Sequence, residues 1–180
     1  KEGITTKGDS LYFYSPKTNW DEAARIAKSY GGHLVYINDK IEEEFIDTTY
    51  ASKLKGHEGE WSEQYLWTGT TGDKSGATNW GDQRAEYMRW DGPGGLQSLP
   101  GRFDSPVVID KSGKWFTTYH ENELAGIIEV PYVQHGNSAY VVVEGPSWQQ
   151  AEDNAIALGG HLVTINGQSE NDWIYNQYLT

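Results

Sequence analysis

Residues 20–38 read Trp-Asp-Glu-Ala-Ala-Arg-Ile-Ala-Lys-Ser-Tyr-Gly-Gly-His-Leu-Val-Tyr-Ile-Asn, a pattern typical of a short amphipathic helix that runs directly into a strand. Asn19 followed by Glu22 three residues later is typical of a helix N-terminus. Gly31 or Gly32 is expected to end the helix in a left-handed conformation. The apolar face of this helix would carry Trp20, Ala23, Ala24, Ala27 and Tyr30.

The same pattern occurs again 128 residues later, where residues 148–166 read Trp-Gln-Gln-Ala-Glu-Asp-Asn-Ala-Ile-Ala-Leu-Gly-Gly-His-Leu-Val-Thr-Ile-Asn. Aligned without a gap, residues 10–46 and 138–174 are identical at 14 of 37 positions. Such a period has the size of a domain, because solenoid repeats are only about 20–50 residues long. We therefore expect a complete domain at residues 1–131 and the N-terminal half of a second, truncated copy at residues 132–180.

The composition argues against several classes of protein. The net charge of −12 argues against nucleic acid as a partner, because phosphate binding needs a basic surface. No stretch approaches the roughly 20 apolar residues of a membrane-spanning helix, so we expect no membrane insertion. The absence of cysteine excludes disulfides, thiol nucleophiles and cysteine-ligated zinc. The 8 Trp and 12 Tyr residues suit either a core or a sugar-stacking surface.

The rest of the first copy is predicted to form a second helix and several short strands. The second helix is expected to start at Asp39 and to turn Ile41, Phe45 and Ile46 inward. Between the predicted strands lies a long stretch rich in Gly, Trp and polar residues that includes Gly92-Pro93-Gly94-Gly95, and long loops of this kind usually bind something. Strands are expected at residues 11–14, 33–37, 67–70, 107–109, 115–118 and 125–129.

In this order the motifs resemble those of the C-type lectin-like domains. The resemblance spans residues 10–130 and implies an α+β double-loop fold with two helices and small antiparallel sheets. It also implies that the first and last strands pair, that a long loop carries the ligand site, and that Trp67 and Trp115 lie in the core. The second copy resembles only the first half of such a domain. The matching residues are Trp20, Ala23, Gly31-Gly32-His33-Leu34-Val35, Ile37, Glu42, Phe45, Trp67-Thr68-Gly69, Gly113-Lys114-Trp115 and Ile127-Ile128-Glu129.

The chain departs from most animal members of that family because it has no disulfides. Its long loop must then be held by packing, by hydrogen bonds or by an ion. Tandem copies without cysteine resemble those of large bacterial surface adhesins. This resemblance implies an extracellular or cell-surface module whose neighbours are other domains of the same chain.

The resemblance further implies that the usual calcium-dependent sugar site is largely lost. In sugar-binding members, a Glu-Pro-Asn or Gln-Pro-Asp loop and an Asn-Asp pair after the hairpin Trp hold a Ca²⁺ ion. This chain has Asp91-Gly92-Pro93-Gly94 and Trp115-Phe116-Thr117 at these places. Glycine and phenylalanine side chains cannot supply the oxygen ligands that Ca²⁺ needs. Asp91 and Asp104 remain nearby as replacements for the missing ligands.

A second calcium position is better preserved. Some family members hold a Ca²⁺ between the glutamate that opens the second helix and the glutamate of the closing strand, which correspond to Glu42 and Glu129. A carbonyl at Val35 or Tyr36 would be a further ligand. Two carboxylates brought together repel each other unless a cation or hydrogen bonds intervene. Alternatively, Glu42 belongs to a capping box with Asp39, and Glu129 accepts backbone N–H donors.

Neither the histidines nor any short motif indicates a catalytic centre. His33 and His161 occupy matching positions, and neither has a second His or carboxylate at ligand spacing, so structural roles are expected. His120 lies in a polar loop and is expected to be solvated or to contact a ligand. The sequence contains no Gly-x-Ser-x-Gly, Gly-rich phosphate or His-Glu-x-x-His motif, which argues against an enzyme.

The long loop and the family resemblance together predict a non-enzymatic extracellular recognition module, part of a larger adhesin, that binds a glycan or a cell-surface protein. Aromatic rings stack on sugar faces, and Arg and Asp side chains can bond sugar hydroxyls. The alternatives are a structural spacer with no ligand of its own, or a domain that binds protein rather than carbohydrate. The candidate ligand-binding residues are Trp90, Asp91, Arg102, Asp104, Phe116 and Tyr119.

Overall fold

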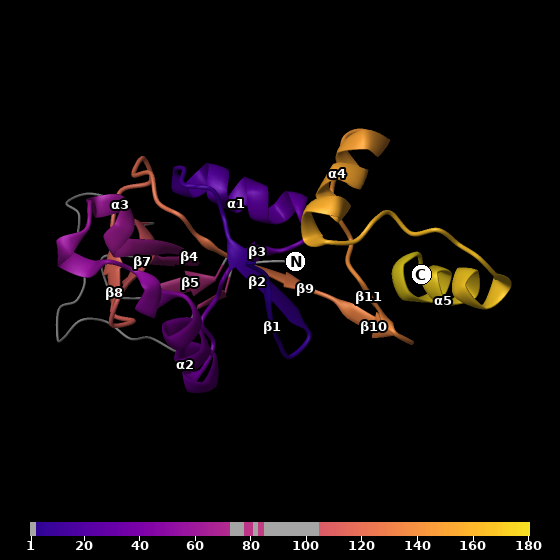
Figure 1. Ribbon diagram of the computed structural model, residues 1–180, viewed down its shortest axis with the longest axis horizontal. Coiled ribbons are helices and arrows are strands. Elements are labelled where there is room, and N and C mark those ends of the chain that lie inside the picture. Colours follow the sequence, from indigo (N-terminus) through magenta and orange to yellow (C-terminus); the bar gives the residue numbers. More distant parts are fainter. Residues whose placement is uncertain (1–2, 73–77, 81–82, 85–104) are drawn as a thin grey trace.

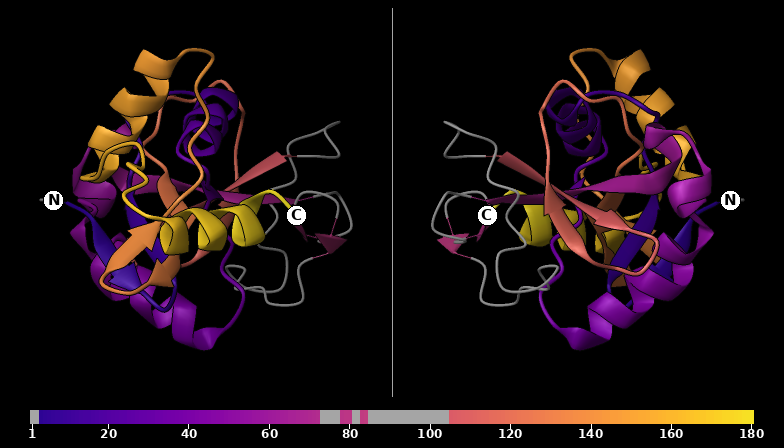
Figure 2. Two further views of the ribbon diagram at one scale, coloured as in Figure 1. Left: turned by 90° about the vertical axis from the view of Figure 1, so that its right-hand side faces the viewer. Right: turned by 90° about the vertical axis from the view of Figure 1, so that its left-hand side faces the viewer.

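The computed structural model describes residues 3–72, 78–80, 83–84 and 105–180 (Figure 1). A larger α+β unit ends at β9 (Ile127–Pro131), and a smaller unit of one hairpin and two helices lies beside it (Figures 1 and 2). The expected α+β class is confirmed. Within the described ranges, none of the helices combines the length and apolar character that crossing a bilayer requires.

A four-stranded antiparallel sheet joins the two ends of the larger unit. β2 (Ser10–Tyr14) pairs with β9 from Ser10, opposite Pro131, to Tyr14, opposite Ile127, so the expected pairing of the opening and closing strands is confirmed. On the other edge of β9, β3 (His33–Leu34) places His33 opposite Glu129. The strands in spatial order are β1 (Thr5–Lys7), β2 (Ser10–Tyr14), β9 (Ile127–Pro131) and β3 (His33–Leu34).

A second antiparallel sheet contains the predicted hairpin whose turn includes Gly113. Its strands in spatial order are β6 (Gln83–Arg84), β5 (Thr78–Trp80), β4 (Tyr65–Gly72), β7 (Ser105–Asp110) and β8 (Trp115–Thr117). The turn between β7 and β8 places Gly113 at φ 73°, a left-handed conformation that suits glycine. The Gly113 N–H donates to the Asp110 carbonyl at 2.9 Å, which closes the expected turn.

Two capped helices, α1 (Trp20–Ser29) and α2 (Lys40–Thr49), accompany the sheets. The Asn19 side chain accepts the Glu22 N–H at 2.9 Å, and the Asp39 side chain accepts the Glu42 N–H at 2.8 Å, as their spacing predicts. Gly31, at φ 78°, follows the last turn of α1. The short helices η1 (Ala51–Lys53), η2 (Gly56–Glu58) and α3 (Trp61–Gln64), which the sequence analysis did not predict, connect α2 to β4.

Two details of the predicted secondary structure are wrong. Ile41 does not point inward, because its side chain is 71 % exposed while Ile46 is fully buried. The two lie five positions apart, which places them about 140° apart around a helix. The strand predicted at residues 33–37 is regular only at His33–Leu34, although Val35 and Ile37 are buried as expected.

The core of the larger unit lies between the sheets and the helices. Trp67 and Trp115 are almost completely buried, as the family resemblance implies. Trp67 Nε1 donates to the Thr18 carbonyl at 3.0 Å, which joins the second sheet to the chain that leads into α1. The Gly69 N–H donates to the Val35 carbonyl at 2.9 Å, so the two sheets are also connected through their backbones.

Each element of the smaller unit starts 128 residues after an element of the larger unit. Gly136 (φ 59°) lies in its hairpin turn where Gly8 (φ 56°) lies in the first hairpin. The Ser147 side chain caps α4 (Trp148–Leu158) as the Asn19 side chain caps α1. The elements are β10 (Val133–His135), β11 (Ser138–Tyr140), α4 (Trp148–Leu158) and α5 (Gln168–Tyr178), which follow the positions of β1, β2, α1 and α2.

The two units differ in how well their apolar side chains are covered. Val163 and Ile165 are each 49 % exposed, whereas their counterparts Val35 and Ile37 are buried beneath the second sheet and β9. The smaller unit has no counterpart of these covering strands within the described residues.

Candidate functional site

Two glutamates and a tyrosine meet between α2 and the first sheet. The Tyr12 hydroxyl lies 3.1 Å from Glu42 Oε1 and 3.0 Å from Glu129 Oε1. Tyr12 and Glu42 are buried, and the Glu129 side chain is 13 % exposed. The phenol has a single hydrogen, so it donates a full hydrogen bond to only one of the two carboxylates. The structure therefore brings together the two predicted calcium ligands.

Glu42 is held by the turn that precedes its helix. The Asn38 N–H and the Asn38 side-chain amide donate to Glu42 Oε2 at 2.9 and 3.1 Å. The same amide also donates to the Tyr36 carbonyl at 3.0 Å. The alternative role in a capping box is found only in part, because Asp39 caps the Glu42 N–H but the Glu42 carboxylate receives the N–H of Asn38 instead.

The second oxygen of Glu129 is the atom left without a partner. Glu129 Oε2 is buried and has no hydrogen-bond partner among the described residues, so the expected backbone donors are not found there. His33 Nδ1 lies 4.0 Å away, beyond hydrogen-bonding distance, and is 3.0 Å from the Leu34 carbonyl. The His33 ring stacks on Tyr36 with centroids 4.6 Å apart. His33 thus has local backbone and ring contacts, and it borders the glutamate pair.

Burial and like charge both act on this cluster. Burial raises the pKa of the Glu42 carboxyl, and the charge of Glu129 raises it further, while hydrogen bonds from Asn38 and Tyr12 oppose the rise. Burial, followed by the charges of the two carboxylates, raises the pKa of the Tyr12 hydroxyl as well. The phenol therefore stays protonated and remains a donor.

The raised pKa of Glu42 predicts a specific pH dependence in calcium-free buffer. The folded protein holds a proton on Glu42 at pH values where the unfolded chain has lost it, so this stabilisation is complete below the ordinary pKa of 4.5 and is lost as pH rises through the folded value. Wild type should therefore lose stability relative to Glu42→Gln as pH rises from 4.5 towards neutrality. Urea unfolding at several pH values measures this. The exposed Glu44→Gln is the control, and parallel curves for wild type and Glu42→Gln would contradict it.

The chemistry of the glutamate pair fits a hard divalent cation. Ca²⁺ prefers carboxylate and carbonyl oxygens, and a cation would relieve both the like charges and the unpartnered Oε2 of Glu129. In the part of the chain that the structure describes, no three His, Cys, Asp or Glu side chains lie close enough together to hold a metal ion. A cation at this place would thus bind Glu42, Glu129 and carbonyl or water oxygens.

Among the described residues, the smaller unit repeats this cluster without a counterpart of Glu129. The Tyr140 hydroxyl donates to Glu170 Oε1 at 3.2 Å, and the Asn166 N–H donates to Glu170 Oε2 at 3.0 Å. The Asn166 amide also donates to the Thr164 carbonyl at 2.8 Å. The repeated cluster contains one glutamate instead of two. These residues lie 128 positions after Tyr12, Glu42, Asn38 and Tyr36.

A second feature is a row of three aromatic rings, which we call the aromatic surface: Trp61, Tyr65 and Phe116. The ring centroids of Trp61 and Tyr65 are 4.4 Å apart, and those of Tyr65 and Phe116 are 5.9 Å apart. Trp61 is 48 % exposed, while Tyr65 and Phe116 are half-buried over the core. Tyr65 and Phe116 are therefore held against the core while Trp61 is accessible, and this arrangement suits stacking on the apolar face of a sugar.

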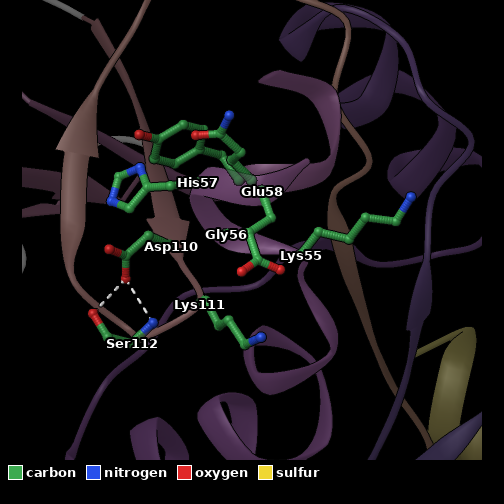
Figure 3. A pocket seen from close by; sticks show the side chains of 9 residues that line it. Lys55, Gly56, His57, Glu58, Asp110, Lys111 and Ser112 are labelled. Carbon is green, nitrogen blue, oxygen red and sulfur yellow. Dashed lines mark hydrogen bonds between the residues drawn. The ribbon is translucent and has the colours of Figure 1, made fainter. Parts of the chain in front are cut away.

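A groove of about 440 Å³ lies beside Tyr65. It is lined by polar side chains of the η2 segment and of the β7–β8 turn, together with Gln64 and Tyr65. Asp110 Oδ1 accepts the Ser112 N–H and hydroxyl at 2.8 and 2.7 Å (Figure 3). The amino group of Lys55 points away from this pair, and it binds Glu63 at 2.7 Å. An aromatic wall beside fixed polar groups is a common arrangement in binding sites.

The predicted ligand residues are placed unequally. Phe116 is one of the three rings of the aromatic surface, and Tyr119 is 48 % exposed. His120, predicted to be solvated or to contact a ligand, lies 3.4 Å from Asp21 Oδ1 and packs edge-on against Trp20. Four of the predicted residues lie outside the described part of the chain, and these are Trp90, Asp91, Arg102 and Asp104.

Sequence reasoning missed two residues of the aromatic surface and two of the glutamate cluster. Trp61 opens α3 and Tyr65 opens β4, and the four-position spacing of these two aromatic residues was a signal. Tyr12 and Asn38 had a weaker signal, which was their identity in both copies, at Tyr140 and Asn166.

The paired terminal strands, the two helices and the second sheet define a C-type lectin-like domain. The Lectin C-type domain family model matches residues 16–125, and the chain belongs to this family. Domains of the family are typically non-enzymatic modules, extracellular or at the cell surface, that recognise carbohydrate or protein. The resemblance inferred from the sequence is confirmed. A comparison with curated proteins gives no match.

Several solved structures share the fold. The mouse scavenger receptor C-type lectin carbohydrate-recognition domain has 17 % identity and a TM-score of 0.59, and the match covers 75 % of this chain and 98 % of that domain. The carbohydrate-recognition domain of cow CD23, in the presence of an oligosaccharide, has 20 % identity and a TM-score of 0.54, with 74 % and 97 % covered. A calcium-independent type II antifreeze protein has 20 % identity and a TM-score of 0.54, with 73 % and 93 % covered. Family members thus often bind Ca²⁺, but some function without it.

Proposed function

We propose that residues 1–131 are a recognition module, without catalytic activity, that binds a glycan through the aromatic surface and through residues of the long loop. The observation that carries this proposal is the row of Trp61, Tyr65 and Phe116, whose outermost residue, Trp61, is 48 % exposed. Phe116 takes the place of a calcium ligand in the sugar-binding pattern, and it supplies ring area there in place of an oxygen. Binding would then depend on stacking and hydrogen bonds, with no ion at the sugar.

We further propose that the candidate residues of the long loop, which lie outside the described residues, take part in glycan binding. Trp90 would supply a further ring, and Asp91, Arg102 and Asp104 would bond sugar hydroxyls. Polar groups in the groove next to Tyr65 would serve the same purpose, because sugars need both an apolar face and fixed hydrogen-bond partners.

We also propose that Glu42 and Glu129 hold one Ca²⁺ ion with a structural role. The support is the buried pair of carboxylates and the unpartnered Oε2 of Glu129. When bound, the ion would neutralise the two charges and tie α2 to β9. The ion would lie between α2 and β9 and would not contact the sugar.

The repeated elements support a further proposal about domain organisation. Residues 132–180 correspond to the first half of a second lectin-like copy, because each of their elements follows its counterpart by 128 residues. A tandem arrangement without cysteine fits a larger adhesin at a cell surface. In such an array, each complete copy would present its own aromatic surface.

A glycan array, probed with the whole chain in Ca²⁺ and again in chelator, tests the proposed function. Binding to a restricted set of glycans that persists in chelator is expected, because no ion contacts the sugar. Binding lost in chelator would overturn the ion-independent mode. The absence of any bound glycan would favour the rival functions, which are recognition of a cell-surface protein or a spacer without a ligand.

A further inference from the structure

The two units touch at the C-terminal turn of α1 (Figure 1). The Ser29 carbonyl belongs to the last turn of the helix, where carbonyls lack intrahelical partners. It accepts the Glu144 N–H at 3.0 Å and the Asn154 side-chain amide at 3.2 Å. The same amide donates to the Glu144 carbonyl at 2.6 Å. Residues of α4 and of the segment before it thus complete the end of α1.

Gly31, two residues after the end of α1, allows this close approach. Gly31 has φ 78°, and a Cβ atom built there would lie 1.8 Å from the Val142 carbonyl oxygen and 3.3 Å from Val141 Cγ1. Val141 packs against the core cluster of the larger unit. A side chain at position 31 would therefore push the smaller unit away. Lys28 and Glu144 add an exposed ion pair at 3.7 Å, which contributes little.

A further contact lies on the first hairpin. The Tyr132 N–H donates to the Asp9 carbonyl at 2.8 Å, and the Tyr132 hydroxyl donates to the Gly8 carbonyl at 3.1 Å. The connection between the two units is therefore bonded to the larger unit at its start, and the smaller unit is bonded again at α4. Two separated points of attachment restrict rotation about the connection.

The residues of the smaller unit that contact α1 and the first hairpin differ from their counterparts in the larger unit. The counterpart of Glu144 is Pro16, which has no N–H to donate, and the counterpart of Asn154 is Ile26, which has no polar side-chain atom. The counterpart of Tyr132 is Ile4, which has no hydroxyl. The docking groups therefore belong to the following copy alone, while the framework of both copies is shared.

We propose that residues 28–32, the end of α1 and the three residues after it, are a docking site for the following lectin-like copy. Glu144 and Asn154 are the residues that dock there, and Gly31 leaves the space they need. The partner of this surface is thus a second copy that carries an N–H donor and a side-chain amide at these two positions. Its consequence is a fixed orientation between consecutive copies, in place of free rotation about a linker.

The test exchanges the docking residues for those of the first copy, in the whole chain. ¹⁵N relaxation should give one rotational correlation time for residues 5–72, 105–131 and 138–178 of the wild type. In the double variant Glu144→Pro/Asn154→Ile, residues 138–178 should lose this common time and tumble faster than the larger unit. Asn171→Ile, on an exposed position of α5, is the control and should keep it. Two separate times in the wild type, or one shared time in the double variant, would overturn the proposal.

A second pair of variants covers the case in which the double variant does not fold. Gly31→Ala should also separate the two correlation times, because the added Cβ displaces Val142. Gly159→Ala is its matched control, since Gly159 has φ 93° at the corresponding helix end and is exposed. Both substitutions strain a left-handed glycine, but only the first should release the smaller unit. Equal behaviour of the two variants would contradict the docking site. The readout involves no glycan, so it is independent of the proposed function.

Discussion

Replacing Trp67 with alanine is expected to lower the free energy of unfolding of the larger unit by about 3–5 kcal/mol. The side chain is fully buried at the centre of the core that joins the two sheets. Its removal leaves a cavity, and it also removes the hydrogen bond from Nε1 to the Thr18 carbonyl. Domains of this kind are stabilised by about 5–15 kcal/mol, so the loss is a large fraction of the total. Urea unfolding followed by circular dichroism measures it.

The matched control is Trp148→Ala. Trp148 is 69 % exposed, so its replacement should change the free energy of unfolding by no more than about 0.5 kcal/mol. Trp67→Phe should fall between the two, because a ring still fills most of the space while the hydrogen bond and part of the buried ring volume are lost. Similar midpoints for Trp67→Ala and wild type would show that the described core is wrong.

Calcium is expected to raise the unfolding midpoint of the wild type through the glutamate pair. An ion that binds only the folded state adds about 2.7 kcal/mol at a free concentration of about 100 times its Kd. The two carboxylates are separated by a single phenol, and the second oxygen of Glu129 has no partner in the described residues, so an ion supplies what the protein lacks there. Calorimetry with Ca²⁺ and with chelator measures the shift.

The shift should disappear in Glu129→Gln, which keeps the shape of the side chain but removes one charge. It should persist in Glu44→Gln, because Glu44 is exposed on α2 and faces away from the pair. A wild-type midpoint that does not change with Ca²⁺ would exclude the structural ion. That result would not contradict the pH dependence predicted from Glu42, because that dependence is measured in calcium-free buffer.

Much of the fold could be predicted because the decisive signals are local. The caps at Asn19 and Asp39, the left-handed Gly31 and the hairpin at Gly113 each follow from a few neighbouring residues. Pairing of β2 with β9 joins residues more than 100 positions apart, and no local signal contains it. That pairing came from the family resemblance.

Less of the candidate site than of the fold could be predicted from the sequence. Glu42 and Glu129 were paired by resemblance, but Tyr12 was not foreseen, because its hydroxyl reaches both carboxylates only after β2 and β9 have paired. The aromatic surface was missed for a similar reason. Trp61 and Tyr65 come close to Phe116 only when β4, β7 and β8 form one sheet. Ile41 was misplaced because an apolar residue type was given more weight than its angular position on the helix.

We propose that this lectin-like module recognises a glycan through the aromatic surface without an ion at the sugar. Titration calorimetry in chelator, with the glycan that binds best on the array, provides the sharpest test. Wild type is expected to bind, Trp61→Ala to lose affinity by about 1–3 kcal/mol because one stacking ring is removed, and Trp148→Ala to bind as wild type does. Equal affinities for wild type and Trp61→Ala would show that the aromatic surface does not bind the glycan.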